Sequence, residues 1–160
     1  MSEKIRISAP VLETFACDIF VAAGLPRDWA QAEAEVLVWA DMRGVGSHGV
    51  LRIPSYVAWM ARGLRRPNAN IHVAAGKGAM VLLEADRGPG LYVMRKAMDM
   101  AIEKASVHGI GWITVRQVTH TGAMGYYVRQ AAKAGMIGIA SCSSRPLMAY
   151  HGTKDAALGT

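Results

Sequence analysis

Two short stretches of the sequence carry residue types that could bind a carboxylate and transfer a proton. In the first, GVGSHGVLRIP, Ser47 and His48 stand where a helix is predicted to begin, and Arg52 follows about one turn later. A helix N-terminus and a guanidinium both favour an anion such as a carboxylate. His48 could then pass a proton to a carbonyl oxygen beside that carboxylate. The simpler interpretation, in which Ser47 only caps a helix and His48 lies on the surface, stays open from spacing alone.

The second stretch, THTGAMGYY, places His120 and several small residues between a predicted strand and a predicted helix. Ligands of α/β proteins favour loops that join a strand to a helix. Gly122 and the free N–H groups at the helix start could hold a phosphate or a nicotinamide amide. The alternative is a threonine-capped helix start in which the glycine only makes the turn, and the residues alone do not decide between the two.

The other motifs carry less chemistry. DRGPG, residues 86–90, resembles a phosphate-binding loop only loosely and predicts a turn, and neither GxGxxG nor GxxxxGK[ST] occurs. No group of histidine, cysteine, aspartate and glutamate residues has the spacing of metal ligands, so no metal site is predicted.

The helices and strands that must position these residues are predicted from the spacing of apolar residues and from the positions of glycine and proline. Ser8, Pro10 and Gly24 are typical of the start and end of a first helix. The pattern predicts helices over 8–24, 26–44 and from about 47 to 63, a linker over 64–70, two strands within 70–86, a helix over 88–109, a strand over 110–117, a helix over 122–135, a strand over 136–144 and a loop-like tail after it. This alternation predicts an α/β fold, with a helical module over residues 1–70 and an α/β layer over 71–160.

Composition limits the class of protein. Of 160 residues, 52% are apolar and 19% are charged, which predicts a folded domain with a real core. Cys17 and Cys142 are far apart with no CxxC, which favours a reducing cytoplasm over a disulfide framework. Charges interrupt every apolar run, so we expect a soluble protein without membrane spans.

The net charge of +6 permits an anionic partner: nucleic acid, a phosphate-bearing cofactor or a carboxylate substrate. A small basic DNA-binding protein is therefore one alternative, because the first three predicted helices could mimic a helix-turn-helix. The third helix argues against it, since the face that would enter the groove is largely apolar. Its apolar residues are Val50, Leu51, Ile53, Tyr56, Val57 and Trp59.

Taken together, the two stretches resemble the malate/L-lactate dehydrogenase family that lacks a Rossmann fold. The matching pieces are ADMRGVGSHGVLRIPSY, DRGPG, HGIGWITVRQVTHTGAMGYYVRQAAKAGMIGIASCSSRP and the terminal LGT. The resemblance implies a helical N-terminal module followed by part of a mixed α/β cofactor-binding domain like that of sulfolactate dehydrogenase. It implies NAD or NADP as cofactor, a small carboxylate as substrate, and a homodimer with no nucleic-acid partner.

The resemblance also implies roles for particular residues. Ser47 and His48 match the family's serine and proton-donor histidine, and Arg52 matches the residue that grips the substrate carboxylate. Thr160 matches a substrate-contacting threonine. The loop from His120 through Thr121, Gly122 and Ala123 to Met124 matches the cofactor-contacting loop, and Ser144 lies at another cofactor-contacting position. His120 is the acid/base in some members; between the two histidines we favour His48, because Arg52 would place the substrate beside it.

The implied reaction is hydride transfer between a nicotinamide cofactor and a 2-hydroxy or 2-oxo acid of the malate and lactate type. Reduction of a cyclic 2-imino acid is an alternative within the same family. Family members are longer chains, so the resemblance implies their N-terminal half. A third possibility is therefore an inactive, shortened relative that acts as a binding or dimerisation module.

Overall fold

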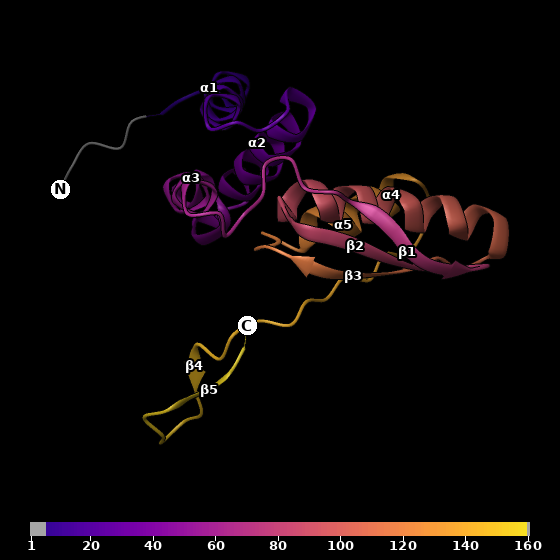
Figure 1. The fold of residues 1–160 in the computed structure, drawn as a ribbon. Coiled ribbons are helices and arrows are strands. Elements are labelled where there is room, and N and C mark those ends of the chain that lie inside the picture. Colours follow the sequence, from indigo (N-terminus) through magenta and orange to yellow (C-terminus); the bar gives the residue numbers. More distant parts are fainter. Residues whose placement is uncertain (1–5, 160) are drawn as a thin grey trace.

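Three helices lead the chain in the computed structural model, which describes residues 6–159 (Figure 1). Helix α1 (Ala9–Ala22) and helix α2 (Arg27–Met42) confirm the first two predicted helices. Proline occupies the first turn of α1, where the missing N–H costs no hydrogen bond. Gly24 then takes the left-handed conformation, with φ of +99°, and ends the helix.

The third helix starts later than its sequence pattern predicts. Two 3-10 turns, η1 (Gly46–His48) and η2 (Val50–Arg52), precede helix α3 (Ile53–Ala61). Gly49 between them is extended, and this breaks the helical path. The prediction that a helix begins near Ser47 is therefore wrong. Pro54 instead lies in the first turn of α3, where its ring is tolerated.

A three-stranded sheet follows, with strand order β1-β2-β3. Strands β1 (His72–Lys77) and β2 (Met80–Gly88) confirm the two strands predicted within 70–86, and they pair antiparallel. Helix α4 (Gly90–His108) then crosses over to β3 (Trp112–Val118), which pairs with β2 in parallel. A parallel pair needs such a crossover, and it places the carboxyl ends of β2 and β3 at the same edge of the sheet.

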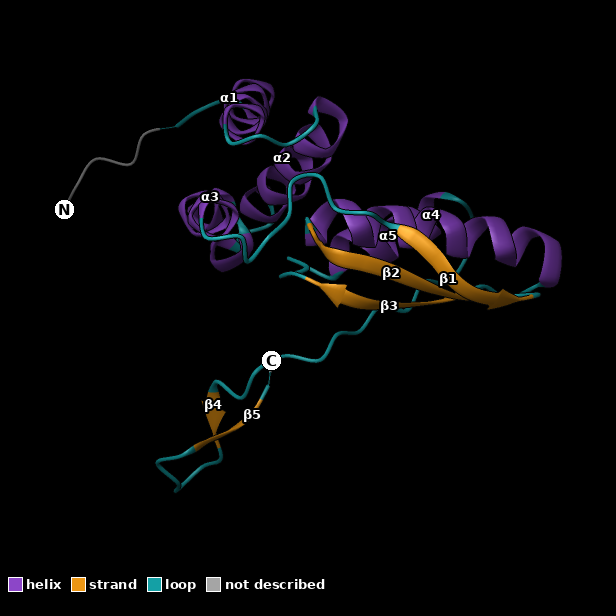
Figure 2. Cartoon of the chain, viewed as in Figure 1, coloured by secondary structure: helices purple, strands orange, loops and turns teal. Residues whose placement is uncertain are grey.

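One face of this sheet is covered and the other is open. Helix α4 packs on β2 and β3, and Leu83 and Ala85 on the covered face are buried against Val93 and Ala97 of the helix. Figure 2 shows α4 on one side of the strands and no helix on the other. This arrangement leaves β1 exposed along its whole length.

A single hydrophobic cluster joins the helices at the start of the chain to the α/β part. Phe20, Leu37 and Tyr56 come from α1, α2 and α3, and they belong to the same buried cluster as Leu91 of α4 and Tyr127 of α5 (Gly125–Lys133). This cluster lies beside the carboxyl ends of β2 and β3, where the functional residues are predicted. The mixed α/β class expected from the sequence is confirmed.

The segment after α5 differs from its prediction. Residues 136–144 do not form a strand, because no described strand lies beside them to share backbone hydrogen bonds. Gly138 instead packs on Val128 and Ala131 of α5. The tail, predicted as a loop, contains a small antiparallel hairpin of β4 (Met148–Ala149) and β5 (Ala156–Leu158), which projects away from the main body (Figure 1). Among the described residues, no helix is both long and apolar enough to cross a bilayer.

Candidate active site

The two predicted histidines come together in the folded chain. His48 lies on the turn η1 and His120 lies in the loop that follows β3. Their rings stack with centroids 5.5 Å apart and planes 28° from parallel. The loop of His120 runs from β3 to α5, as the sequence predicts, and it lies at the carboxyl end of the parallel strands. Two stretches that are distant in sequence therefore form one site.

The His48 turn is held by a few polar contacts near the surface. The Ser47 hydroxyl lies 2.9 Å from His48 Nδ1, so Ser47 contacts the histidine instead of capping a helix. Arg52 donates its Nε–H to the Ser47 carbonyl at 2.6 Å. Asp41 at the end of α2 accepts the Val50 N–H at 2.9 Å. These contacts place the serine, the histidine and the arginine on one short segment.

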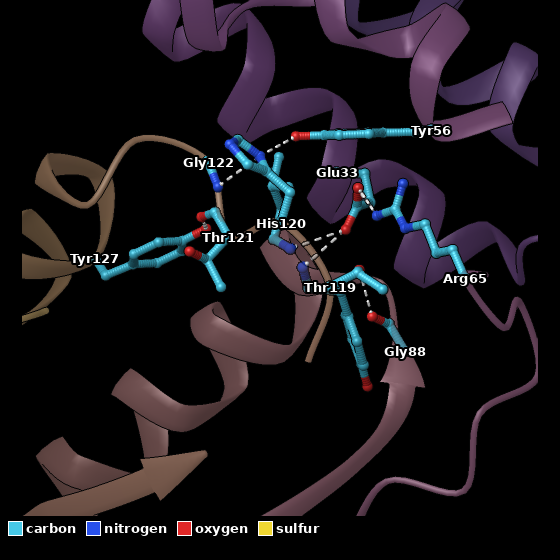
Figure 3. Close-up of polar contacts among 11 residues, drawn as sticks. Glu33, Tyr56, Arg65, Gly88, Thr119, His120, Thr121, Gly122 and Tyr127 are labelled. Carbon is cyan, nitrogen blue, oxygen red and sulfur yellow. Dashed lines mark hydrogen bonds and ion pairs between the residues drawn. The ribbon is translucent and has the colours of Figure 1, made fainter. Parts of the chain in front are cut away.

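The backbone of the His120 loop is fixed from both ends. Thr119 donates its hydroxyl hydrogen to the Gly88 carbonyl at 2.7 Å, and the Tyr127 hydroxyl donates to the Thr121 carbonyl at 2.6 Å (Figure 3). The carbonyls of Thr119 and His120 lie so close to Gly90 that a Cβ there would overlap them. DRGPG, predicted as a turn, instead forms the end of β2 and the start of α4, and its last glycine gives the loop room to pass over the start of that helix.

The His120 ring has a defined protonation pattern. Tyr56 places its hydroxyl 2.7 Å from His120 Nδ1, and the Gly122 N–H points at the same nitrogen at 3.3 Å (Figure 3). A backbone N–H can only donate, so Nδ1 is the acceptor and the neutral ring carries its proton on Nε2. Gly122 reaches this position with φ of +68°, a conformation that favours glycine.

A buried ion pair lies behind Tyr56. Arg65 and Glu33, with exposed fractions of 1% and 0%, form a salt bridge through Arg65 Nη2 and Glu33 Oε2. The other carboxylate oxygen of Glu33 accepts the N–H groups of Leu91 and Tyr92, both at 3.1 Å, at the start of α4. The Arg65 guanidinium in turn lies 4.4 Å from the centre of the Tyr56 ring. Sequence reasoning missed all three side chains of this group.

Both histidines are biased towards the neutral form. Burial lowers the pKa of His120 to about 4, and the positive charges of Arg52, His48 and Arg65 contribute in the same direction. The pKa of His48 is also lowered, by burial first and by Arg52 second. Burial raises the pKa of Tyr56, so its hydroxyl keeps its proton and can donate it in a hydrogen bond. Near neutral pH the site therefore offers two neutral imidazoles beside a permanent cation.

The remaining predicted residues fall in different places. Ala123 and Met124 complete the His120 loop and accept the first N–H bonds of α5, from Tyr126 and Tyr127. Ser144 lies on the exposed segment that leads to the β4–β5 hairpin. Thr160 lies outside the described residues. Within residues 6–159, no group of three or more histidine, cysteine, aspartate or glutamate side chains could hold a metal ion.

Two surface hollows are lined by other residues. One, of about 460 Å³, lies between α2 and α4 and includes Glu35, Tyr92 and Arg95. The second, of about 430 Å³, lies by the sheet and includes His72 and Asp86. Neither includes His48 or His120. The first is lined by charges of both signs, and the second by two carboxylates, one histidine and two amides. The stacked histidines and Arg52 therefore remain the group with the chemistry for proton transfer and anion binding.

The chain matches known proteins in sequence over nearly its whole length. A family model described as malate/L-lactate dehydrogenase matches residues 7–160. The chain is 40% identical to a malate dehydrogenase of Pyrococcus abyssi over 156 residues, which cover 98% of this chain and 43% of that protein. It is 36% identical to the L-sulfolactate dehydrogenase of Methanocaldococcus jannaschii over 143 residues, or 89% of this chain and 42% of the relative. The chain thus spans less than half the length of these relatives.

The fold agrees with that of a solved relative. The structure of malate dehydrogenase from Pyrococcus horikoshii superposes on this chain with a TM-score of 0.80 and 36% sequence identity. The match covers 82% of this chain and 38% of that one.

Proposed function

The chain belongs to the malate/L-lactate dehydrogenase family, and from this premise we propose that it carries proton-transfer and substrate-binding residues of an enzyme that interconverts 2-hydroxy and 2-oxo acids with NAD(P). The observation that carries the proposal is that the rings of His48 and His120 stack with centroids 5.5 Å apart, with Arg52 on the same short segment as His48. Relatives named for malate and L-sulfolactate support the substrate class, because both molecules present a carboxylate beside the carbon that is oxidised.

Arg52 is the residue we assign to the substrate carboxylate. Its guanidinium has five N–H donors in a planar fork. The Nε–H donates to the Ser47 carbonyl, and this contact fixes the plane of the guanidinium beside His48. The terminal Nη groups can then form the paired hydrogen bonds that a carboxylate accepts. Binding of the carboxylate would place the neighbouring carbon next to the two imidazoles.

His48 is the residue we assign to proton transfer. In oxidation it would accept the hydroxyl proton of the substrate, and in reduction it would return a proton to the oxygen. His120 suits this role less well, because a pKa of about 4 makes it a weak base and leaves almost none of it protonated near neutral pH. Its Nε2–H can instead donate a hydrogen bond to the substrate oxygen and stabilise negative charge that develops there.

The described residues fit a nicotinamide cofactor at the loop between β3 and α5. This loop lies at the carboxyl end of two parallel strands, where ligands of α/β proteins are commonly bound. We assign His120 through Met124, with Ser144, to contacts with NAD or NADP. When bound, the cofactor supplies or accepts the hydride.

The proposal is tested first by activity and by Arg52. We expect the protein to oxidise NADH or NADPH with one or more members of a panel of 2-oxo acids, with cyclic 2-imino acids included as the alternative substrate class. Arg52→Ala should lower kcat/KM by roughly 30-fold or more, since loss of a hydrogen-bonded charge pair costs about 2 kcal/mol or more. Cofactor affinity, measured by fluorescence titration, should stay near that of the unchanged protein.

The exposed Arg43 at the end of α2 provides a matched control, because Arg43→Ala removes the same charge from a neighbouring element. Equal kinetic constants for Arg52→Ala and the unchanged protein would contradict the assigned role. Cofactor binding without turnover of any acid would favour the alternative of a binding or dimerisation module. Salt-dependent DNA binding without cofactor binding would favour the nucleic-acid alternative.

We also propose that the protein is a homodimer and acts in the cytoplasm. Ile137 and Ile139 are 96% and 82% exposed, and Met80 and Trp112 lie side by side on the open face of the sheet. Large apolar side chains this exposed favour burial against another surface. Cys17 and Cys142 are unpaired, as suits a reducing compartment. Sedimentation velocity of the purified protein tests the first point directly.

A further inference from the structure

We infer that Tyr56 is a positioning residue that holds His120 with its ring proton on Nε2, and that the buried Glu33–Arg65 pair keeps the Tyr56 ring in the place where it does so. The inference deepens the proposed function and rests on it for its catalytic meaning. Its structural content, which is the orientation and the protonation pattern of one imidazole, can be measured without any substrate.

The first step is the contact between Tyr56 and His120. The hydroxyl lies 2.7 Å from Nδ1, a normal length for a strong O–H···N bond. The hydroxyl is a neutral phenol that can donate, and the second donor on the same nitrogen, the Gly122 N–H, excludes a proton there. Two donors from different elements therefore converge on one lone pair, and Nε2 is left as the donor of the neutral ring (Figure 3).

The second step concerns what holds Tyr56. Its side chain is 1% exposed, and its ring faces the Arg65 guanidinium at 4.4 Å, a cation–π distance. Glu33 keeps the guanidinium there through the buried salt bridge, and the carboxylate is itself held by the Leu91 and Tyr92 amides. The ring is therefore packed against a charged group that has little freedom to move. A phenol fixed in this way can aim its hydroxyl at one atom.

The third step links this support to the site. His120 stacks on His48, so rotation of the His120 ring about its Cβ–Cγ bond would exchange donor and acceptor nitrogens on the side where substrate is expected. The ring with Nε2–H can donate to a developing negative charge on the substrate oxygen, and the other tautomer cannot do so from that nitrogen. A hydrogen bond to Nδ1 is thus a means of choosing the useful tautomer, as second partners do for many histidines.

Two tyrosine variants of the whole protein test the inference. Tyr56→Phe removes the hydroxyl and keeps the packed ring. Tyr127→Phe is the matched control, because it removes an equally buried hydroxyl that donates to the backbone of the same loop, at Thr121. The measurements are the two ¹⁵N shifts of the His120 ring, which report the tautomer, and the pH titration of that ring by NMR.

For the unchanged protein we expect a protonated Nε2, an unprotonated Nδ1 and a pKa of about 4 for His120. In Tyr56→Phe the Nδ1–H tautomer should become measurable. The pKa should rise by about one unit towards 6.5, because a hydrogen bond to the neutral form is lost. In Tyr127→Phe both quantities should stay unchanged. Arg65→Lys, which keeps the charge and loses the flat guanidinium, should change them in the same direction and by less.

Kinetics then connect the contact to the reaction. We expect Tyr56→Phe to lower kcat by roughly 10- to 100-fold, as misplacement of a catalytic group does, with little change in KM because Arg52 still binds the carboxylate. A protonated Nδ1 in the unchanged protein, an unaltered His120 in Tyr56→Phe, or equal changes in both tyrosine variants would each overturn the inference. The predicted NMR results in a protein that turns over no acid would leave the contact standing and reject the proposed function instead.

Discussion

The two histidine segments of the site are built differently although their rings touch. The His120 loop is held by buried partners from three elements: Tyr56 of α3, Gly90 of α4 and Tyr127 of α5. The His48 turn is held by short-range contacts near the surface, with Ser47 exposed and Arg52 half-buried. One histidine is therefore fixed by the core of the protein, and the other is held by contacts within its own segment and with the end of α2.

This contrast suits a site in which one group must be aimed and another must move a proton. A hydrogen-bond donor works best when it is oriented in advance, since no reorganisation is then needed as charge develops. A residue that gains and loses a proton needs contact with both substrate and solvent. In the proposed function the fixed segment would act as a template, and the His48 turn would carry together the arginine assigned to the carboxylate and the histidine assigned to proton transfer.

The largest effect should come from the ion pair beneath the fixed segment. Arg65→Met leaves the Glu33 carboxylate buried without its cation, and such a loss costs about 3–5 kcal/mol of unfolding free energy. Arg66→Met is the control, because Arg66 is 46% exposed and its pair with Asp86 is worth about 0–1 kcal/mol. Denaturant unfolding of both variants measures the difference. Similar losses of unfolding free energy in the two variants would mean that the buried ion pair supports the fold no more than the surface pair does.

The His48 turn should show the opposite pattern. His48→Ala should lower turnover by about 10²–10⁴-fold, the usual cost of losing a general acid, while unfolding free energy changes by less than about 1 kcal/mol. Steady-state kinetics and thermal unfolding of the same preparation provide both numbers. If His120→Ala alone lowers turnover on this scale, the proton-transfer role belongs to His120 and not to His48.

A glycine-to-alanine change can be made in contact with each segment, at Gly90 for the His120 loop and at Gly49 for the His48 turn. A Cβ at Gly90 would overlap the backbone carbonyls of Thr119 and His120, whereas a Cβ at Gly49 would overlap the side-chain carboxylate of Asp41. Backbone must shift in the first case, so we expect Gly90→Ala to cost about 1–3 kcal/mol. In the second case Asp41 can rotate and lose its bond to the Val50 N–H, which costs about 1 kcal/mol. Equal costs in denaturant unfolding would contradict the contrast.

The smallest effect is a dependence of stability on pH. The folded-state pKa of His120, about 4, is below the value of about 6.5 in the unfolded chain, so the unfolded state binds more protons between these values. The contribution is fully present above pH 6.5 and is lost as the pH falls towards 4. Because the ring is only partly buried, we expect a loss of about 1–2 kcal/mol.

His120→Gln isolates this contribution. Acid also protonates carboxylates such as Glu84, whose pKa is held low by a hydrogen bond from Arg116. This lowers the unfolding free energy of both proteins equally, so it cancels in their difference. The stability difference between the two proteins should therefore change between pH 7 and pH 4.5. A constant difference would mean that His120 is not kept neutral by the fold.

Much of the fold follows from local signals. Gly24 and Gly109 end helices in left-handed conformations, and the glycine-containing turn near residue 78 joins β1 to β2 as its sequence indicates. Where the structure of a segment depends on contacts with distant segments, its local pattern predicts the wrong element. The predicted strand over 136–144 lacks a neighbour among the described strands, and the helix predicted from Ser47 is interrupted at Gly49.

The sequence identified the candidate residues of the site but not the side chains that support them. His48, Arg52 and His120 stand out by type, and the histidines do meet. Arg65 lies in a segment predicted as a linker, and nothing local connects it to Glu33. One signal existed: Glu33 is a charged residue on the face of α2 that also carries Ala30 and Leu37, both fully buried. A carboxylate in an apolar stripe predicts a buried partner. Which residue is that partner depends on the tertiary structure, because Arg65 is distant from Glu33 in the sequence.

Glu33 has a consequence for how the chain acquires its structure. Its carboxylate is satisfied only when three segments, from α2, the stretch after α3 and the start of α4, have come together. Before that moment the charge keeps its water, and the apolar face of α2 cannot close around it. We expect the early helices and the α/β part to fold in one cooperative step. The Leu91 and Tyr92 amides should then exchange hydrogen for deuterium only through global opening, and would report the stability of the whole molecule.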